Sequence, residues 1–227
     1  MRIHNSGGTA AHSRRTVLKW SGGVMAMLTL SGGVFPNFGI SPALAADLGS
    51  GDIGILNYAY ALEQLEAAFY TKVVETPYGD MSDAEKQILT DIRDHEVEHR
   101  EFLKNALADK AIPGLDVDFS KIDFASRESV LTTAKTFEDL GVSAYNGAGK
   151  LLKNGDYLTA AGKIVSVEAR HAATIRDLLQ PGTISFAGPD VVDKNGLDVA
   201  RAPAAVLKAA GPFIKTEVTA NEILGMN

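Results

Sequence analysis

One pattern of polar side chains occurs twice in this chain, on segments whose apolar residues recur at helical spacing. Each copy has a glutamate, a tyrosine seven residues later, and then a glutamate and a histidine in the order Glu-x-x-His. The two copies are Glu63, Tyr70, Glu96 and His99, and then Glu138, Tyr145, Glu168 and His171. Because each copy spans two helical segments, the repeat predicts two hairpins that bring four carboxylates and two imidazoles into one bundle.

The first 46 residues have the composition of an export signal rather than of a folded domain. They contain four basic residues, including the pair Arg14-Arg15, and no acidic residue. An apolar stretch, 20–35, leads to the small-residue site Ala43-Leu44-Ala45, and this order of regions is typical of a cleaved secretory signal. A retained membrane anchor is the competing interpretation. It is disfavoured because the stretch is shorter than the ~20 apolar residues that span a bilayer, and Pro36 follows it.

The rest of the chain is acidic and free of cysteine. Without residues 1–46, 18 basic and 28 acidic side chains remain, which gives a net charge of about −10. This charge disfavours a nucleic-acid partner and weakly attracts cations. The absence of cysteine excludes disulfides, thiolate ligands and a thiol nucleophile. Any metal must therefore be held by carboxylate oxygen and imidazole nitrogen.

The first hairpin is predicted over residues 52–108. Its first helix, 52–75, has apolar residues at helical spacing and ends at a Thr-Pro-Tyr-Gly sequence. The second helix begins at Ser82, which stands three residues before Glu85 as in a capping box, and runs to about residue 108. The apolar stripe of this helix is expected to comprise Ile88, Ile92, His95, His99, Phe102 and Ala106.

The second hairpin follows a connection, 112–125, that is long enough for a crossover. A third helix is predicted over 127–153. Asn154-Gly155 is expected to end it, and Asp156 to cap a fourth helix over 157–179. The apolar stripe of the fourth helix is expected to comprise Leu158, Ala161, Val165, Glu168, Ala172, Ile175 and Leu179.

These patterns divide the chain into three parts. Residues 1–46 are predicted to be a signal peptide of the twin-arginine type, and 47–182 an all-α four-helix bundle with a long crossover between its second and third helices. Residues 183–227 are expected to form an irregular C-terminal extension that packs on the bundle, with one short helix over 204–210.

The repeated carboxylates predict a site for two metal ions. A glutamate on the apolar seam of a helix is a buried charge, which costs several kcal/mol unless something compensates it. Three residues correspond to about 300° of helical rotation, so each Glu-x-x-His presents a bridging carboxylate and an imidazole on one face. The glutamates of the first and third helices then act as terminal ligands. The predicted ligands are Glu63, Glu96, His99, Glu138, Glu168 and His171, around two Fe or two Mn ions.

Several neighbouring residues leave alternatives open. Glu66 follows Glu63 by three residues, so either could be the ligand from the first helix. The tyrosine spacing favours Glu63 and leaves Glu66 behind the ligands or at the solvated edge of the seam. His95 could hydrogen-bond a ligating imidazole, or pair with Asp91. The two tyrosines of the repeat could act in catalysis, or could be core residues with a satisfied hydroxyl.

A single Glu-x-x-His match would be explained more easily as a charged pair on a helix surface. Two matches favour a metal site, because each lies on the apolar stripe of the second helix of a hairpin. Each also follows its upstream glutamate at a similar distance, 33 residues in one copy and 30 in the other. A bundle without metal would require the inward glutamates to be protonated or solvated.

The order of the predicted ligands resembles that of the ferritin-like superfamily. The segments LNYAYALEQLEAAFY, 56–70, and DHEVEHREF, 94–102, are similar to an exported ferritin-like domain family that includes plant desiccation-related proteins. The resemblance covers about residues 52–180 and implies a four-helix bundle with the same six metal ligands. The chain departs from rubrerythrin-type members because it lacks the cysteines of a rubredoxin centre. Its tail also does not resemble the short fifth helix of a ferritin cage.

Two functions are expected from these patterns. The first is redox chemistry on peroxide, dioxygen or ferrous iron, in protection against oxidative or metal stress. The alternative is a non-enzymatic metal-binding or structural stress protein of the desiccation type. The expected partners are metal ions and a small oxidant, with no stable membrane insertion after cleavage, and a homo-oligomer stays open. The run SRRTVLK, 13–19, resembles the twin-arginine export motif and implies a periplasmic or other extracytoplasmic location.

Overall fold

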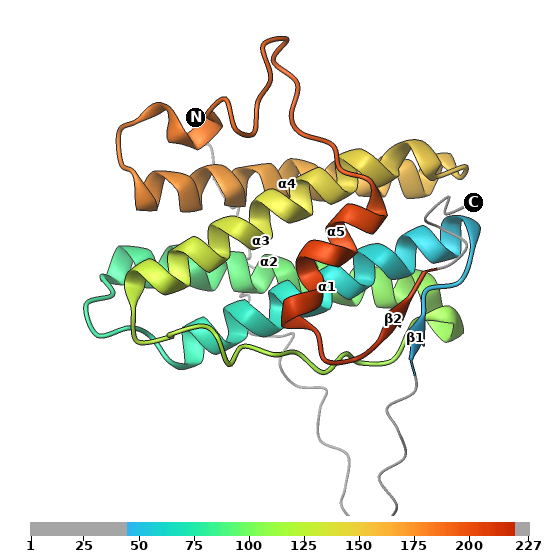
Figure 1. The fold of residues 1–227 in the computed structure, drawn as a ribbon, viewed down its shortest axis with the longest axis horizontal. Helices are drawn as coiled ribbons and strands as arrows, with labels where there is room; N and C mark the ends of the chain where they lie inside the picture. Colours follow the sequence, from blue (N-terminus) through green and yellow to red (C-terminus); the bar gives the residue numbers. More distant parts are fainter. Residues whose placement is uncertain (1–44, 221–227) are drawn as a thin grey trace, which may run out of the picture. The chain divides into compact units, whose positions relative to one another are not determined.

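The computed structural model describes residues 45–220, so the predicted signal peptide lies almost wholly outside the described residues. Four long helices form two hairpins around a shared core, which confirms the predicted all-α bundle (Figure 1). Their bounds are α1, Gly51–Glu75; α2, Asp83–Leu107; α3, Arg127–Ala148; and α4, Gly155–Leu179. Within residues 45–220, no helix is long and apolar enough to cross a membrane.

The long crossover between α2 and α3 covers α1. Helix α1 is buried on all sides from Gly54 to Ala67, because the crossover lies over the face that the other long helices leave free. Two amide side chains on that face serve the crossover backbone. Asn57 Oδ1 accepts from the Ile112 N–H at 3.0 Å, and Gln64 Oε1 accepts from the Leu115 N–H at 2.9 Å. An irregular segment can thus be buried without losing its hydrogen bonds.

The ends of the helices agree with the predictions in α2 and differ in the second hairpin. Ser82 and Glu85 form the predicted capping box. Helix α3, however, ends at Ala148 and a 3-10 turn, η3, follows over Gly149–Leu151, so the predicted extension to residue 153 is wrong. The carboxylate of Asp52 accepts from the backbone N–H groups of residues 153 and 154, both at 2.8 Å, and so redirects the chain.

The start of α4 also corrects the sequence analysis. Asn154, not Asp156, caps the helix, because its side-chain oxygen accepts from the Asp156 N–H at 2.8 Å. Gly155 is the first residue of α4 rather than the stop signal of α3. Asparagine is among the best residues at this capping position, and once it holds the first turn the glycine simply continues into the helix.

The predicted apolar stripes of α2 and α4 are partly wrong. Phe102 and Leu158, which were expected to face the core, are 50% and 47% exposed. The buried face of α2 instead comprises Glu85, Leu89, Ile92, Glu96, Leu103 and Leu107. Helix α2 has two sets of apolar residues at helical spacing, displaced by one position, as at Ile88 and Leu89. Periodicity alone cannot decide which set faces the core.

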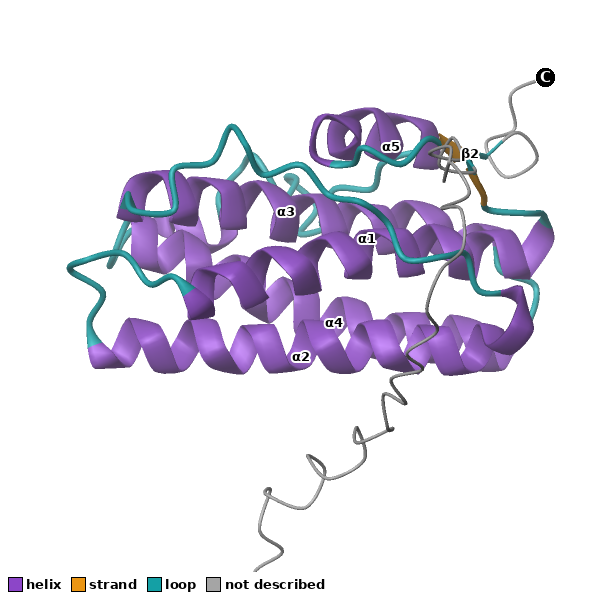
Figure 2. Ribbon diagram, turned by 90° about the horizontal axis from the view of Figure 1, so that it is seen from below, coloured by secondary structure: helices purple, strands orange, loops and turns teal. Residues whose placement is uncertain are grey.

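The C-terminal segment packs on the bundle. It contains a 3-10 turn, η4, Ile184–Ala187, then the short helix α5, Pro203–Ala210, and a second 3-10 turn, η5, Gly211–Phe213. Helix α5 begins one residue before its predicted start and lies beside α3, on the side of the bundle away from α2 and α4 (Figure 2). A strand pair was not predicted: β1, Ala46–Asp47, runs parallel to β2, Val218–Thr219.

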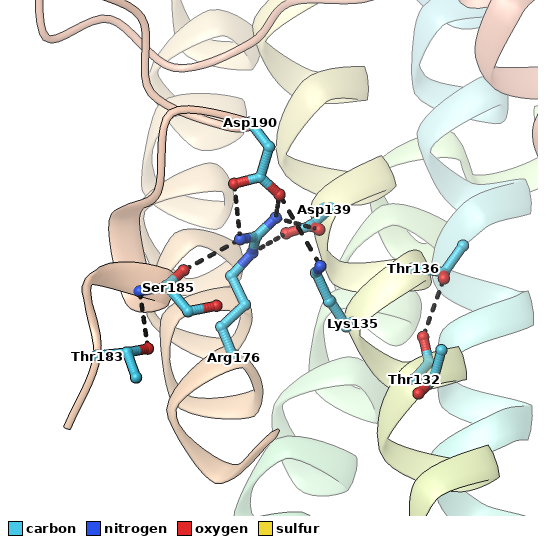
Figure 3. Close-up of polar contacts among 8 residues, drawn as sticks. All are labelled: Thr132, Lys135, Thr136, Asp139, Arg176, Thr183, Ser185 and Asp190. Atoms are coloured by element: carbon cyan, nitrogen blue, oxygen red, sulfur yellow. Dashed lines mark hydrogen bonds and ion pairs between the residues drawn. The ribbon is translucent and has the colours of Figure 1, made fainter. Parts of the chain in front are cut away.

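A buried arginine fastens this segment to α3 and α4 (Figure 3). The guanidinium of Arg176 donates to both carboxylate oxygens of Asp139 on α3 at 2.7–2.8 Å, and to those of Asp190 in the C-terminal segment at 2.8 and 3.2 Å. It also donates to the Ser185 carbonyl oxygen at 3.0 Å. All five of its N–H groups are therefore used, which explains how its side chain can be only 2% exposed.

Candidate metal centre

The six predicted ligands meet in the middle of the bundle. All four glutamates are fully buried, with no measurable exposure. Their ligand atoms fall into two groups, and within each group the atoms lie within 4.8 Å of one another. One group comprises Glu63, Glu96, His99 and Glu168, and the other comprises Glu96, Glu138, Glu168 and His171. Glu96 and Glu168 belong to both groups, so ions bound in the two groups would share these two carboxylates.

The two hairpins contribute to this cluster in the same way. The Tyr70 hydroxyl on α1 donates to Oε1 of Glu138 on α3, and the Tyr145 hydroxyl on α3 donates to Oε1 of Glu63 on α1, both at 2.5 Å. Each tyrosine therefore holds the terminal glutamate of the other hairpin. The second oxygen of each glutamate stays without a hydrogen bond among residues 45–220. The repeat read from the sequence is thus an approximate twofold symmetry in space.

The histidines cross over in the same manner. Nδ1 of His99 on α2 lies 2.9 Å from Oε1 of Glu168 on α4, and Nδ1 of His171 on α4 lies 2.8 Å from Oε1 of Glu96 on α2. Although these distances are short, none of the four atoms has a hydrogen-bond partner, so neither pair is oriented as a hydrogen bond. These close atoms are therefore left available as ligands for a metal ion.

The unsatisfied polar atoms of the structure gather at this one place. Of ten buried side-chain atoms without a partner in the described part of the chain, eight belong to the six predicted ligands, and each ligand supplies at least one. Buried polar groups are otherwise almost always hydrogen-bonded. Oxygen and imidazole donors of this kind suit iron and manganese. The residues present therefore fit a pair of metal ions.

Burial and crowding of like charges shift the ionisation of the cluster. Burial raises the pKa of Glu63 to about 8, against the lowering effect of His99. Burial would also raise the pKa of Glu96, but contacts with His171 and His99 hold it near 2. Burial lowers the pKa of both histidines, yet the surrounding carboxylates outweigh it, so the pKa of His99 rises to about 12 and that of His171 to about 11. Without metal, the imidazoles thus act as the counter-ions of the carboxylates.

The two residues predicted to lie behind the ligands take different positions. His95 Nδ1 lies 3.0 Å from His171 Nε2, so it can orient that imidazole. Asp91, the alternative partner considered for His95, accepts from Gln87 instead. Glu66 is 4% exposed and belongs to neither ligand group. Of the two glutamates considered on α1, the structure therefore groups Glu63 with the other ligands.

The approach to the cluster is open on one side, which the sequence analysis did not predict. A groove of about 590 Å³ lies between α2 and α4 and reaches His99. Its lining comprises Glu98, His99, Phe102, Asp156, Thr159, Ala160, Lys163, Ile164 and Val167. At the position that matches His95 in the other hairpin, the chain has Val167. The two groups of side chains therefore differ: the imidazole of His171 lies against another histidine, and the imidazole of His99 borders the groove.

Comparison with known proteins agrees with this geometry. The sequence pattern of the ferritin-like domain matches residues 51–181, a range that contains all six clustered ligands. A search of curated protein sequences found no match. Because the matched range makes up more than half of the chain, this protein belongs to the ferritin-like domain family.

Proposed function

We propose that this protein holds two iron or two manganese ions in the bundle and uses them in redox chemistry on hydrogen peroxide, dioxygen or ferrous iron. The observation that carries the proposal is the pair of ligand groups that share Glu96 and Glu168. A single-ion site would not need two shared carboxylates, and a purely structural core would not leave eight ligand atoms without partners.

The protein's own residues suit such chemistry. When bound, a pair of iron or manganese ions supplies the exchange of two electrons with a small oxidant. The tyrosine hydroxyls fix one oxygen of Glu63 and of Glu138 and leave the other free for an ion. His99 borders the groove between α2 and α4, so a small molecule can approach it. The ligands are otherwise buried, which keeps bulk water and larger reductants away.

We also propose that the chain is exported by the twin-arginine route to the periplasm or another extracytoplasmic space. The support is the Arg14-Arg15 pair, followed by an apolar stretch and a small-residue cleavage site. This route carries folded proteins, so the ions would be bound before export. Replacing both arginines by lysine should leave a metal-loaded precursor in the cytoplasm. A retained precursor without metal would contradict loading before export.

The metal content of the natively matured protein tests the main proposal. Mass spectrometry should find about two Fe or Mn per chain, and Glu96→Ala and His171→Ala should lose both metal and turnover of peroxide, dioxygen or ferrous iron. Metal without turnover in the wild-type protein would support the alternative, a non-enzymatic metal-binding or structural stress protein. Turnover that survives in both variants would remove the cluster as the site of the reaction.

A further inference from the structure

The twofold relation between the hairpins fails at one pair of positions beside the ligands. Glu66 lies three residues after Glu63 on α1, and Gly141 lies three residues after Glu138 on α3. The symmetry of the ligands would allow a glutamate at both positions or a small residue at both. The chain instead has a carboxylate in one hairpin and no side chain in the other.

Gly141 leaves space that the Glu66 carboxylate occupies. A Cβ atom on residue 141 would lie 3.1 Å from Oε1 of Glu66 and 3.1 Å from Oε2 of Glu168, which is tighter than carbon and oxygen normally allow. A glycine inside a helix costs roughly 0.5–1 kcal/mol relative to alanine. At a buried mid-helix position this cost needs a reason, and the approach of the two carboxylates provides one.

The surroundings of Glu66 are those of a group that needs a partner. Its side chain is 4% exposed, and among residues 45–220 it takes part in no hydrogen bond or ion pair. By contrast Glu85, another buried glutamate, is paired with Arg127. A carboxylate with so little exposure and no cation beside it among the described residues is costly, and a bound metal ion would remove that cost.

We propose that Glu66 is a seventh protein ligand of the metal pair, in the space that Gly141 leaves free. This inference rests on the proposed metal site. The two imidazoles come from α2 and α4, whereas Glu66 and Gly141 come from α1 and α3, so the carboxylate approaches from the other pair of helices. A fifth carboxylate raises the coordination number and negative charge of the site. Both changes favour manganese and iron, which accept six ligands, over zinc, which prefers four.

Cobalt(II) is a suitable probe, because its visible absorption is weak at five or six ligands and several times stronger at four. We expect Glu66→Ala and the near-isosteric Glu66→Gln to bind two Co(II) ions per chain at least about tenfold more weakly than the wild-type protein. Their absorption per ion should be higher, and the preference for Mn(II) over Zn(II), measured by competition, should fall. Glu85→Gln is the matched control, because it changes a buried glutamate that is paired with Arg127 and lies outside both ligand groups.

The possible outcomes separate the two proposals. If both Glu66 variants match the wild-type protein in Co(II) affinity and spectrum, Glu66 is not a ligand, although the metal site stands. If the wild-type protein binds no Co(II), Fe or Mn, the metal site itself is wrong. Gly141→Ala should weaken Co(II) binding more in the wild-type background than in Glu66→Ala. An equal loss in both backgrounds would show that the glycine makes room only for Glu168.

Discussion

The hydroxyl of Tyr145 on α3 donates a 2.5 Å hydrogen bond to Oε1 of Glu63 on α1, and so ties the two hairpins together at the cluster of glutamates and histidines. Tyr70 and Glu138 make the matching bond in the opposite direction. A tyrosine that holds a carboxylate in this way limits the rotation of that carboxylate before an ion binds. The two hydroxyls therefore act on the arrangement of the ligands, whatever part they take in the reaction.

Tyr145→Phe should weaken metal binding about tenfold, the usual loss when a ligand is no longer held by its neighbour. It should also lower the free energy of unfolding of the metal-free protein by about 2 kcal/mol, because the buried carboxyl group of Glu63 then loses its hydrogen-bond donor. Calorimetric titration with Mn(II) and urea denaturation measure the two effects. Tyr70→Phe is the symmetric comparison. Unchanged affinity with lost turnover would instead assign Tyr145 a role in electron transfer.

Spacing within single helices accounts for what the sequence could predict. The Glu-x-x-His pairs and the Ser82 cap depend on contacts three residues apart, so the sequence predicted the four helices and the six side chains that cluster between them. The features that the sequence did not predict depend on how one hairpin packs against the other. The crossed tyrosine bonds, the space beside Gly141 and the groove at His99 are of this kind. Overlapping apolar stripes similarly hid the exposure of Phe102.

Val167 lines the groove that reaches His99, so a larger side chain there should restrict access. We expect Val167→Phe to raise the KM for peroxide several-fold while the number of bound ions stays the same, because Val167 lines the groove and belongs to neither ligand group. Steady-state kinetics and metal analysis on the same sample measure both quantities. Arg170→Phe, at an exposed position on α4 outside the groove lining, is the control. Equal KM values for Val167→Phe and the wild-type protein would mean that the oxidant enters elsewhere.

The ion pair between Glu85 and Arg127 should make stability depend on pH in the acidic range. Burial opposes ionisation of Glu85, but its bonds to Arg127 and to the Ser82 N–H lower its pKa below the ordinary value of 4.5. A lowered pKa in the folded state stabilises the fold above pH 4.5, and this stabilisation is lost as pH falls through the folded value. Glu85→Gln should therefore cost about 1 kcal/mol at pH 7, a modest figure because Arg127 is one-third exposed.

The same substitution should cost progressively less below pH 4.5. Denaturation of the wild-type protein and Glu85→Gln at matched pH values isolates this pair from the other carboxylates, because those are common to both proteins. A difference between the two that stays constant down to pH 3 would show that the charge of Glu85 does not contribute and that only its packing matters.

Arg176 should be the most sensitive single position outside the metal centre. Its bonds to Asp139, Asp190 and the Ser185 carbonyl use every N–H group of the planar guanidinium. Neither a shorter side chain nor the compact ammonium group of lysine can make all of these bonds. Arg176→Met should lower the free energy of unfolding by about 3 kcal/mol, the low end for breaking a buried pair, since Asp190 faces solvent. Arg176→Lys should recover only part of this loss. Arg93→Lys, at a partly exposed pair with Asp94, should change stability by less than about 1 kcal/mol.

Because Asp139 directly follows Glu138 on α3, the Arg176 variants also test whether the C-terminal segment affects the metal centre. Without its bonds to Arg176, Asp139 should hold the neighbouring Glu138 less firmly. Metal binding should therefore weaken in Arg176→Met, even under conditions in which the variant is fully folded. Asp190→Asn weakens the attachment of the C-terminal segment but leaves the bonds between Arg176 and Asp139 in place, and should leave metal affinity unchanged. If both variants weakened metal binding equally, the C-terminal segment itself, rather than the position of Asp139, would support the ligands.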